Sequence, residues 1–170
     1  MAYYALLAFG IIVLAASAAL CIKFGIRLVK VRKSQDEVMK EHPEAKRVFT
    51  ERGILMMDSF IIVIFLFMGF MEMTNSASSD HLIMPMIMGA VALAYLAQVL
   101  RTVVRGTLII GRHFFMSQDQ VCRYRSITKM EPYRNRVYVH VKDGSYIELT
   151  QTQADLVSQA NKKSGTFNRT

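Results

Sequence analysis

Cysteine is scarce in this chain of 170 residues, which contains only Cys21 and Cys122. Two cysteines exclude a disulfide-rich scaffold, and neither has a second thiol or a histidine at metal-ligand spacing, so we expect both to be reduced. Catalytic motifs are also missing: the sequence has no HExxH, no GxxxxGK[ST], no CxxC and no serine triad in motif context. We therefore predict a protein that is not an enzyme and that has no cofactor and no bound metal.

Lysine and arginine are absent from two long stretches, residues 1–22 and 53–100, although the chain carries a net charge of +8. All 21 basic residues lie in residues 23–52 or from Arg101 onward. Cytoplasmic segments of membrane proteins are enriched in basic residues, so this partition predicts how a membrane protein is oriented. It also argues against a nucleic-acid partner, because an anionic membrane surface accounts for the basic excess.

Hydrophobic residues make up 52% of the chain and form three long segments, at about 3–29, 54–74 and 82–105. A helix over residues 54–74, at about 1.5 Å per residue, crosses a hydrocarbon core of about 30 Å. The first segment contains Ala16-Ser17-Ala18, which resembles a signal-peptide cleavage site, but basic residues follow it and none precedes it, so we expect a retained helix. The fold class predicted for residues 1–105 is a membrane α-helical unit with three transmembrane helices. Its N-terminus would lie outside and its C-terminus in the cytosol, at the plasma membrane and more specifically the bacterial cytoplasmic membrane.

Small residues recur in the first and third segments. We expect them to let these two helices pack closely against each other. They are Ala15, Ala16, Ala18 and Ala19 in the first segment, and Gly89, Ala90, Ala92, Ala94 and Ala97 in the third.

A polar connector over residues 30–53 joins the first two segments. Ser34 and Glu37 form a capping-box pattern that predicts a short helix ending at His42-Pro43. Pro43 would then open a second short helix with Ala45, Val48 and Phe49 on one face. This second helix could lie under the lipid headgroups, dock a partner, or serve as a solvated connector.

Beyond residue 105 the hydrophobic period changes to two, which predicts a small α+β cytosolic domain over residues 106–163. It would hold about four antiparallel strands and a C-terminal helix over Gln153–Lys162, capped by Thr152. We expect residues 164–170 to form a disordered tail. The four strands are predicted at residues 107–116, 120–128, 136–142 and 145–150.

The last two predicted strands bracket a turn, and the buried face fixes their register. A three-residue loop with Gly144 at positive φ pairs Val139 with Ile147 and Val137 with Leu149. His140 then faces Tyr146, and Tyr138 faces Glu148, on the other side of the hairpin.

The segment CRYRSITKMEPYRNRVYVHVKDGSYIELTQTQADLVSQAN combines a strand ending in Tyr124-x-x-Ile127, the hairpin Val137–Leu149 and an amphipathic closing helix. It resembles the small pleckstrin-homology-like (PH-like) domains of bacterial membrane proteins, in particular the YcxB-like C-terminal domain. The likeness covers about 45 residues, a quarter of the chain. A full pleckstrin-homology barrel has seven strands, whereas the sequence predicts four. The family implies binding or scaffolding roles and supplies no catalytic or headgroup motif.

Ionisable residues near the ends of the second and third segments are candidates for intramembrane function. Glu72 would be a proton or ion site, or would reach the outer interface and be hydrated. Asp58 would pair with Arg101 as a clamp between helices, or form a gate or an anionic-lipid site with Arg101 and Arg105. The loop at residues 75–80, with Asp80 and His81, is a weaker candidate for a metal or proton site.

The junction Arg105-Gly106 leaves almost no linker between helix and sheet, so the cytosolic domain must lie close to the bilayer. Each basic residue near an anionic leaflet contributes about 1 kcal/mol of attraction. The candidates for contact with inner-leaflet lipid are Arg112, Arg123, Arg125 and Lys129, with Arg134 and Arg136 also near the surface. The alternative is that these residues form a solvated basic surface that only follows the positive-inside bias.

These features favour a non-enzymatic membrane accessory or scaffold protein. Its cytosolic domain would mediate assembly with a membrane partner or with further copies of the chain, at an anionic inner leaflet. The alternative is an oligomeric small channel or transporter subunit with Glu72 or Asp58 in the conduction path.

Overall fold

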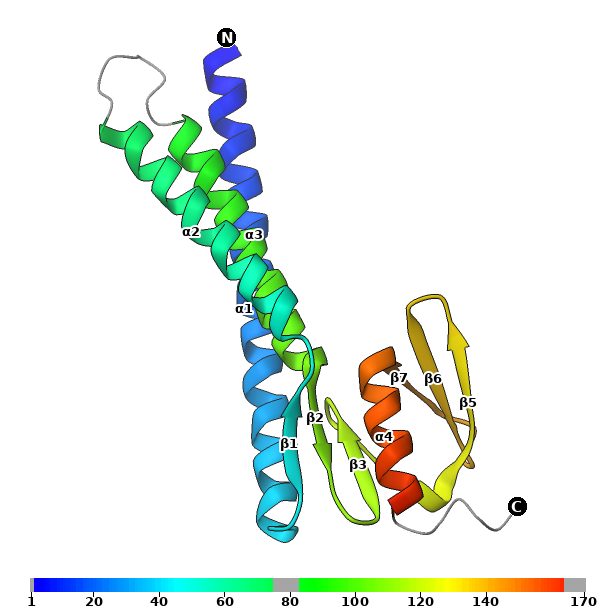
Figure 1. The fold of residues 1–170 in the computed structure, drawn as a ribbon. Helices are drawn as coiled ribbons and strands as arrows, with labels where there is room; N and C mark the ends of the chain where they lie inside the picture. The colour runs from blue at the N-terminus through cyan, green and yellow to red at the C-terminus, as the bar shows by residue number, and fades with distance from the viewer. Residues whose placement is uncertain (1, 75–82, 164–170) are drawn as a thin grey trace. The chain divides into compact units, whose positions relative to one another are not determined.

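The structure is a computed structural model that describes residues 2–74 and 83–163 (Figure 1). Among these residues it contains three long helices, seven strands and a C-terminal helix. The chain divides into two compact units, which we call the helical unit (residues 1–29 and 51–104) and the sheet unit (residues 30–50 and 105–170). The predicted tail at 164–170 and the loop at 75–80, with His81, lie outside the described residues.

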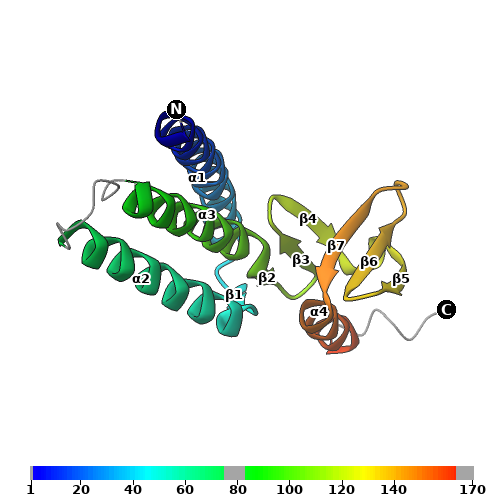
Figure 2. The same ribbon diagram turned by 90° about the horizontal axis from the view of Figure 1, so that it is seen from above.

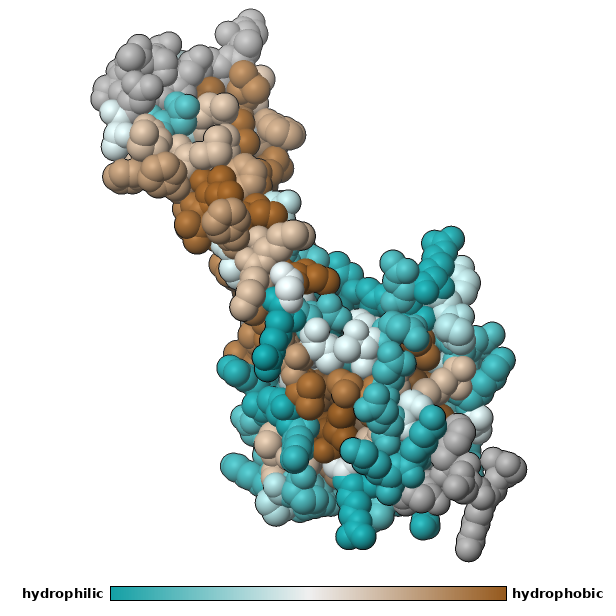
Figure 3. Space-filling view, in the orientation of Figure 1, coloured by the Kyte–Doolittle hydropathy of each residue, from teal (hydrophilic) through white to brown (hydrophobic). Residues whose placement is uncertain are grey.

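The three long helices are α1 (Ala2–Glu41), α2 (Arg52–Thr74) and α3 (Ile83–Gly106). Each is long and apolar enough to cross a membrane. Figure 3 shows hydrophobic residues over these helices and mainly hydrophilic residues over the sheet unit. The outer face of α2 is apolar and open, with Phe60 67% and Phe67 62% exposed, as expected for side chains that meet lipid acyl chains.

Small residues do bring the three long helices together, but not all of the predicted ones do so. Gly69 of α2 lies against α3, since a Cβ there would be 3.4 Å from Cβ of Met88. On α1 the buried positions include Gly10 and Ser17, and Cys21 Sγ donates a hydrogen bond to the Leu93 carbonyl of α3 at 2.9 Å. The predicted packing of the first-helix alanines is wrong for three of them, because Ala15, Ala16 and Ala19 lie on the exposed side of α1.

The first helix does not stop near residue 29 as predicted but continues to Glu41. The reason is that its inward positions continue at helical spacing into the sheet unit, where Val31 and Gln35 are buried. Further along the same face, Val38 and Met39 pack against a core cluster that includes Ile109 and Met116. No separate helix begins at Ser34, although α1 does end immediately before His42-Pro43.

The second short helix predicted for the connector is also wrong, because residues 46–49 form strand β1 (Lys46–Phe49). β1 pairs antiparallel with β2 (Thr107–Ile110), and Val48 lies opposite Leu108. This pairing between distant segments overrides the local helical pattern of residues 43–51.

Among the described residues the sheet unit contains seven strands in two antiparallel sheets, whereas about four strands were predicted. The first has the order β1-β2-β3-β4, with β3 at Phe114–Ser117 and β4 at Gln120–Arg123. The second has the order β5-β6-β7, with β5 at Ile127–Tyr133, β6 at Arg136–Val141 and β7 at Tyr146–Thr150. A short 3-10 helix, Tyr124–Ser126, separates them.

The predicted strand at 107–116 is therefore two strands joined by a tight turn at residues 111–113. Gly111 permits this turn, because a Cβ there would be 2.8 Å from Cδ1 of Phe114. β2 and β3 are almost entirely buried, with a core on each face of the sheet. Strands that are buried on both faces have few polar residues, so β2 and β3 form one nearly continuous apolar segment in the sequence. The turn between them was therefore not predicted.

The predicted hairpin register is confirmed. Val139 lies opposite Ile147 and His140 opposite Tyr146. The Val141 N–H donates to the Ser145 carbonyl at 2.9 Å, which closes a three-residue loop over residues 142–144, and Gly144 has a φ of +83°.

The last element, α4 (Gln151–Lys163), covers the core between the sheets (Figure 2). Its Val157 is fully buried with Leu108, Phe115 and Leu149. The cap is Thr150 rather than the predicted Thr152. Thr150 and Gln153 form a capping box, in which the Thr150 N–H donates to Gln153 Oε1 at 3.0 Å and the Gln153 N–H donates to Thr150 Oγ1 at 3.4 Å.

Candidate functional site

Asp58 is the most buried ionisable residue of the helical unit, with 6% of its surface exposed. The predicted ion pair with Arg101 is not formed: no Asp58 pair occurs among the ion pairs of the described residues, and Arg101 is exposed. Within that part of the chain, Asp58 Oδ2 has no hydrogen-bond partner. A buried carboxylate oxygen without a partner is costly, so Asp58 stays a candidate binding position for a cation or proton rather than a clamp.

Glu72 lies in the last turn of α2 and is exposed. Its side chain is not enclosed by the helical unit. Asp80, which the sequence pairs with His81 as a weaker candidate, lies outside the described residues, so no cluster with Glu72 is defined.

The start of β2 is tied to the rest of the sheet unit by hydrogen bonds to two backbone carbonyls. Gln153 Nε2 of α4 donates to the Arg105 carbonyl at 2.7 Å. Thr50, which follows β1, donates its N–H and its hydroxyl to the Gly106 carbonyl at 3.0 and 3.1 Å. No residue separates α3 from β2, and only Thr50 and Glu51 separate β1 from α2. The connections between the membrane helices and the sheet unit are therefore very short.

We call the end of the sheet unit at which these connections lie, marked by Thr50 and Gly106, its membrane end, and the opposite end its far end. In the first sheet Phe49 pairs with Thr107 at the membrane end, and Lys46 pairs with Ile110 towards the far end. The turn at 111–113 follows Ile110, so Arg112 lies at the far end, about 13 Å of strand away from Thr107.

The other predicted lipid-contact residues follow the same division. Arg123 pairs with Phe114, next to the 111–113 turn, and Arg125 lies in the 3-10 helix that leads into the start of β5. Lys129 lies early in β5, opposite His140, and contacts Glu131 at 3.4 Å. All four are exposed. Contact of Arg112, Arg123, Arg125 and Lys129 with lipid stays a prediction, but none of them lies at the membrane end.

Three tyrosines that the sequence reasoning did not single out cross the outer face of the second sheet. Tyr138 of β6 contacts both Tyr133 and Tyr146, with ring centroids 6.3 and 5.5 Å apart. The Arg134 guanidinium lies 5.5 Å from the centre of the Tyr133 ring. Alternation in RVYVH and YIELT already put Tyr138 and Tyr146 on the outer face, so that signal could have identified two of the three rings.

Charged residues surround these rings. Arg136 forms an ion pair with Glu148, and Glu131 lies 3.5 Å from His140 Nε2. The outer face is thus an aromatic row flanked by paired charges.

Two ionisable groups of the sheet-unit core are held in their neutral forms. Burial raises the pKa of Cys122 to about 11, with a smaller contribution from the charge of Asp143. Burial also raises the pKa of Tyr124 to about 12, and its hydroxyl donates to the Gly111 carbonyl at 3.2 Å. A thiol held protonated is a poor nucleophile, so Cys122 acts as a core residue.

Across residues 2–74 and 83–163, no group of three or more His, Cys, Asp or Glu residues is positioned to hold a metal ion. The described chain thus has three helices of membrane-spanning length and a two-sheet domain closed by a C-terminal helix. Comparison with protein-family models, curated proteins and solved structures finds no match to it.

Proposed function

We propose that this chain is an integral membrane accessory or scaffold protein whose cytosolic sheet unit mediates assembly at the inner leaflet. The observation that carries the proposal is the continuity of α1, whose last turns belong to the core of the sheet unit. Val31 and Gln35 are 3% and 2% exposed there, and Gln35 Nε2 donates to the Gln118 carbonyl at 3.4 Å. A helix of membrane-spanning length thus supplies part of the sheet-unit core, so a partner bound to this unit is recruited to the membrane.

The PH-like resemblance belongs to the same proposal. Seven described strands in sheets of four and three, followed by a helix, match the strand number of a full pleckstrin-homology barrel. This supports extending the resemblance from about 45 residues to the whole sheet unit, including β1 from the connector. Such domains imply binding rather than catalysis.

Assembly within the membrane is supported by the side of α1 that the monomer leaves open. Ala15, Ala16 and Ala19 are exposed there, and small side chains allow another helix to approach closely. A membrane protein or a second copy of this chain would pack against this alanine face.

The test is the assembly state of the full chain in mild detergent and in nanodiscs, measured by light scattering. Replacing Ala15 and Ala19 together by Leu should reduce assembly, whereas Val63→Leu, on the open face of α2, should not. A photoreactive residue at position 16, introduced in the native host, identifies a protein neighbour. A monomer that crosslinks only to lipid contradicts the proposal.

A small channel or transporter subunit is the second candidate, and the unpartnered Asp58 Oδ2 favours it. A carboxylate in a conduction path would bind the passing ion. Ion flux into liposomes that is lost in Asp58→Asn or Glu72→Gln would support this function. An equal flux in the wild type and in empty liposomes would rule it out.

A further inference from the structure

We propose that the β5–β6 turn, residues 133–136, is a lipid anchor that places Tyr133 and Arg134 in the headgroup layer of the inner leaflet. The inference rests on the membrane threading of the proposed function but not on its assembly role. According to this proposal the β5–β6 turn contacts lipid, whereas the basic residues at the far end of the sheet unit face the cytosol.

A chain of contacts within the sheet unit places this turn at the membrane end. Gln153 binds the Arg105 carbonyl, at the point where the chain leaves α3. Gln153 is joined to Thr150 by the capping box, Thr150 pairs with Arg136, and Arg136 pairs with Tyr133.

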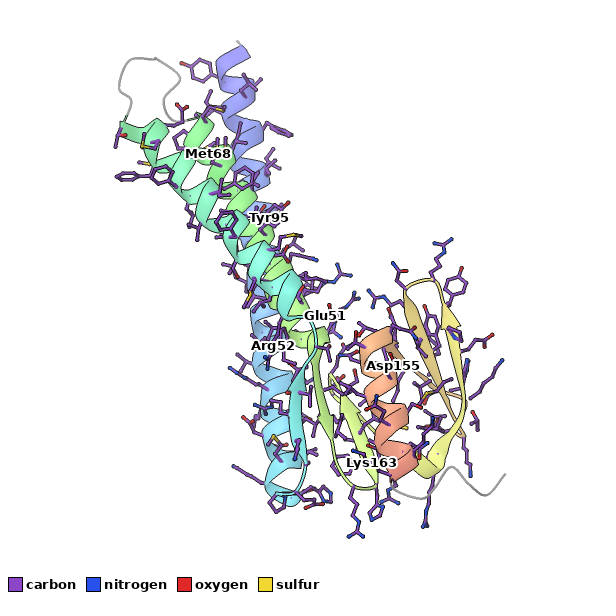
Figure 4. The ribbon with its side chains drawn as sticks, in the orientation of Figure 1. Glu51, Arg52, Met68, Tyr95, Asp155 and Lys163 are labelled. Atoms are coloured by element: carbon purple, nitrogen blue, oxygen red, sulfur yellow. The ribbon has the colours of Figure 1, made fainter. Side chains whose placement is uncertain are left out.

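Two strand spacings separate Thr150 from Tyr133, which is about 10 Å. In Figure 1 the β5–β6 turn and the start of β2 lie at the same end of the sheet unit, and in Figure 4 Asp155 lies nearer that end of α4 than Lys163. Because Arg105 and Gly106 end a membrane-length helix, this end of the unit is the one that the chain delivers to the bilayer surface.

The chemistry of the turn suits an anionic interface. Tyr133 is 56% exposed, and tyrosine is enriched where one side of a ring meets lipid and the other meets water. Arg134 occupies the first position of the two-residue loop with a φ of +52°, and its guanidinium lies over Tyr133. Among the described residues Arg134 has no acidic partner within ion-pair distance, so its charge is available to a lipid phosphate.

The other charged groups on this face are engaged with one another. Arg136 is neutralised by Glu148, and Glu131 is shared between Lys129 and His140. Asp155, on the first turns of α4, and Glu51, which follows Thr50, are acidic groups that would weaken attraction to anionic lipid at this end.

Tryptophan fluorescence gives a direct test, because the chain contains no tryptophan. Tyr133→Trp and Tyr146→Trp each introduce a single reporter on the same sheet face, at sites that are 56% and 60% exposed. Tyr146 pairs with His140, about 13 Å along β6 from Arg136, so it is the matched control. The full chain is reconstituted in vesicles with anionic lipid and brominated acyl chains, and flotation establishes insertion.

The expected result is that the tryptophan of the Tyr133→Trp variant is blue-shifted and quenched more strongly than that of the Tyr146→Trp variant. Equal quenching in the two variants, or stronger quenching in Tyr146→Trp, overturns the anchor while leaving assembly and insertion intact. A chain that fails to float contradicts the membrane insertion on which the anchor rests.

Arg134→Gly removes the cation and keeps a residue that accepts positive φ. In the Tyr133→Trp background it should lower the docked-to-undocked ratio about fivefold, the equivalent of about 1 kcal/mol for one basic residue at the surface. The loss should occur in anionic vesicles and disappear in zwitterionic ones. Quenching that is unchanged by Arg134→Gly in anionic vesicles would remove Arg134 from the anchor.

Discussion

Gln153→Ala should destabilise the sheet unit strongly. Gln153 is 1% exposed, its Oε1 accepts from the Thr150 N–H, and its Nε2 donates to the Arg105 carbonyl. Alanine removes both side-chain bonds and leaves two backbone groups without these partners in a buried site. At about 1–2 kcal/mol for each such loss, the free energy of unfolding should fall by about 2–4 kcal/mol.

The loss can be measured by the accessibility of Cys122, which is 3% exposed in the core. Urea is titrated into the detergent-solubilised chain, with Cys21 replaced by Ala, and each sample is pulsed with a fluorescent maleimide. Gln159→Ala is the matched control, because Gln159 is an exposed glutamine of the same helix and should change stability by less than about 0.5 kcal/mol. Equal midpoints for the two variants would refute the role assigned to Gln153.

The variant Gln153→Glu tests the two side-chain hydrogen bonds of Gln153 one at a time. Glutamate preserves the acceptor for the Thr150 N–H and is a favoured capping-box residue, but it cannot donate to the Arg105 carbonyl at pH 7. Stability close to that of the wild type would show that the capping box alone matters. A loss as large as that of Gln153→Ala would assign the effect to the bond with Arg105.

Three further predictions concern single positions. Because the pKa of Cys122 is about 11 in the folded chain and 9.0 ordinarily, the neutral thiol stabilises the fold fully below pH 9. That stability, about 2 kcal/mol, is lost as the pH rises from 9 to 11, and the difference in unfolding free energy between wild type and Cys122→Ala should shrink over that range. Gly111→Ala should cost about 1–3 kcal/mol, because its methyl group overlaps the Phe114 ring. Gly53→Ala, with nothing within 4 Å, is the control in thermal melts. Asp58→Asn should leave the melting temperature unchanged or raise it, since no ion pair is broken, and a fall of several degrees would show that the carboxylate is paired.

The three apolar helices and the last hairpin could be predicted because their signals are local. Segment length and the absence of basic residues define residues 54–74, and the structure places α2 at Arg52–Thr74. The hairpin register followed from alternation alone, since only one loop length puts Val137, Val139, Ile147 and Leu149 on the buried face. The orientation of the helices in a membrane stays a prediction.

Strand β1 could not be predicted, because its partner β2 is distant in the sequence. Residues 43–51 carry a helical pattern, and only the pairing of Val48 with Leu108 selects the extended form. The tyrosine row was missed because its first ring, on Tyr133, lies at the end of β5, whereas the predicted strand ended at residue 128. The unpartnered oxygen of Asp58 could not be predicted either. The positions of Asp58 on α2 and Arg101 on α3, both near the predicted cytosolic end of their helices, suggest that they are close but do not show which side of α3 Arg101 occupies.

The extension of α1 explains why the connector is neither a membrane-surface helix nor a flexible linker. Its buried positions recur at helical spacing in each unit, at Gly10 and Ser17 in the helical unit and at Val31 and Gln35 in the sheet unit. One helix thus supplies packing positions to two separate cores. The position of the charged residues follows from this, since Lys23 and Arg27 are exposed on α1 between the two regions of burial. Two of the basic residues that the sequence predicts to orient the chain therefore lie on α1 where it passes from one core to the other.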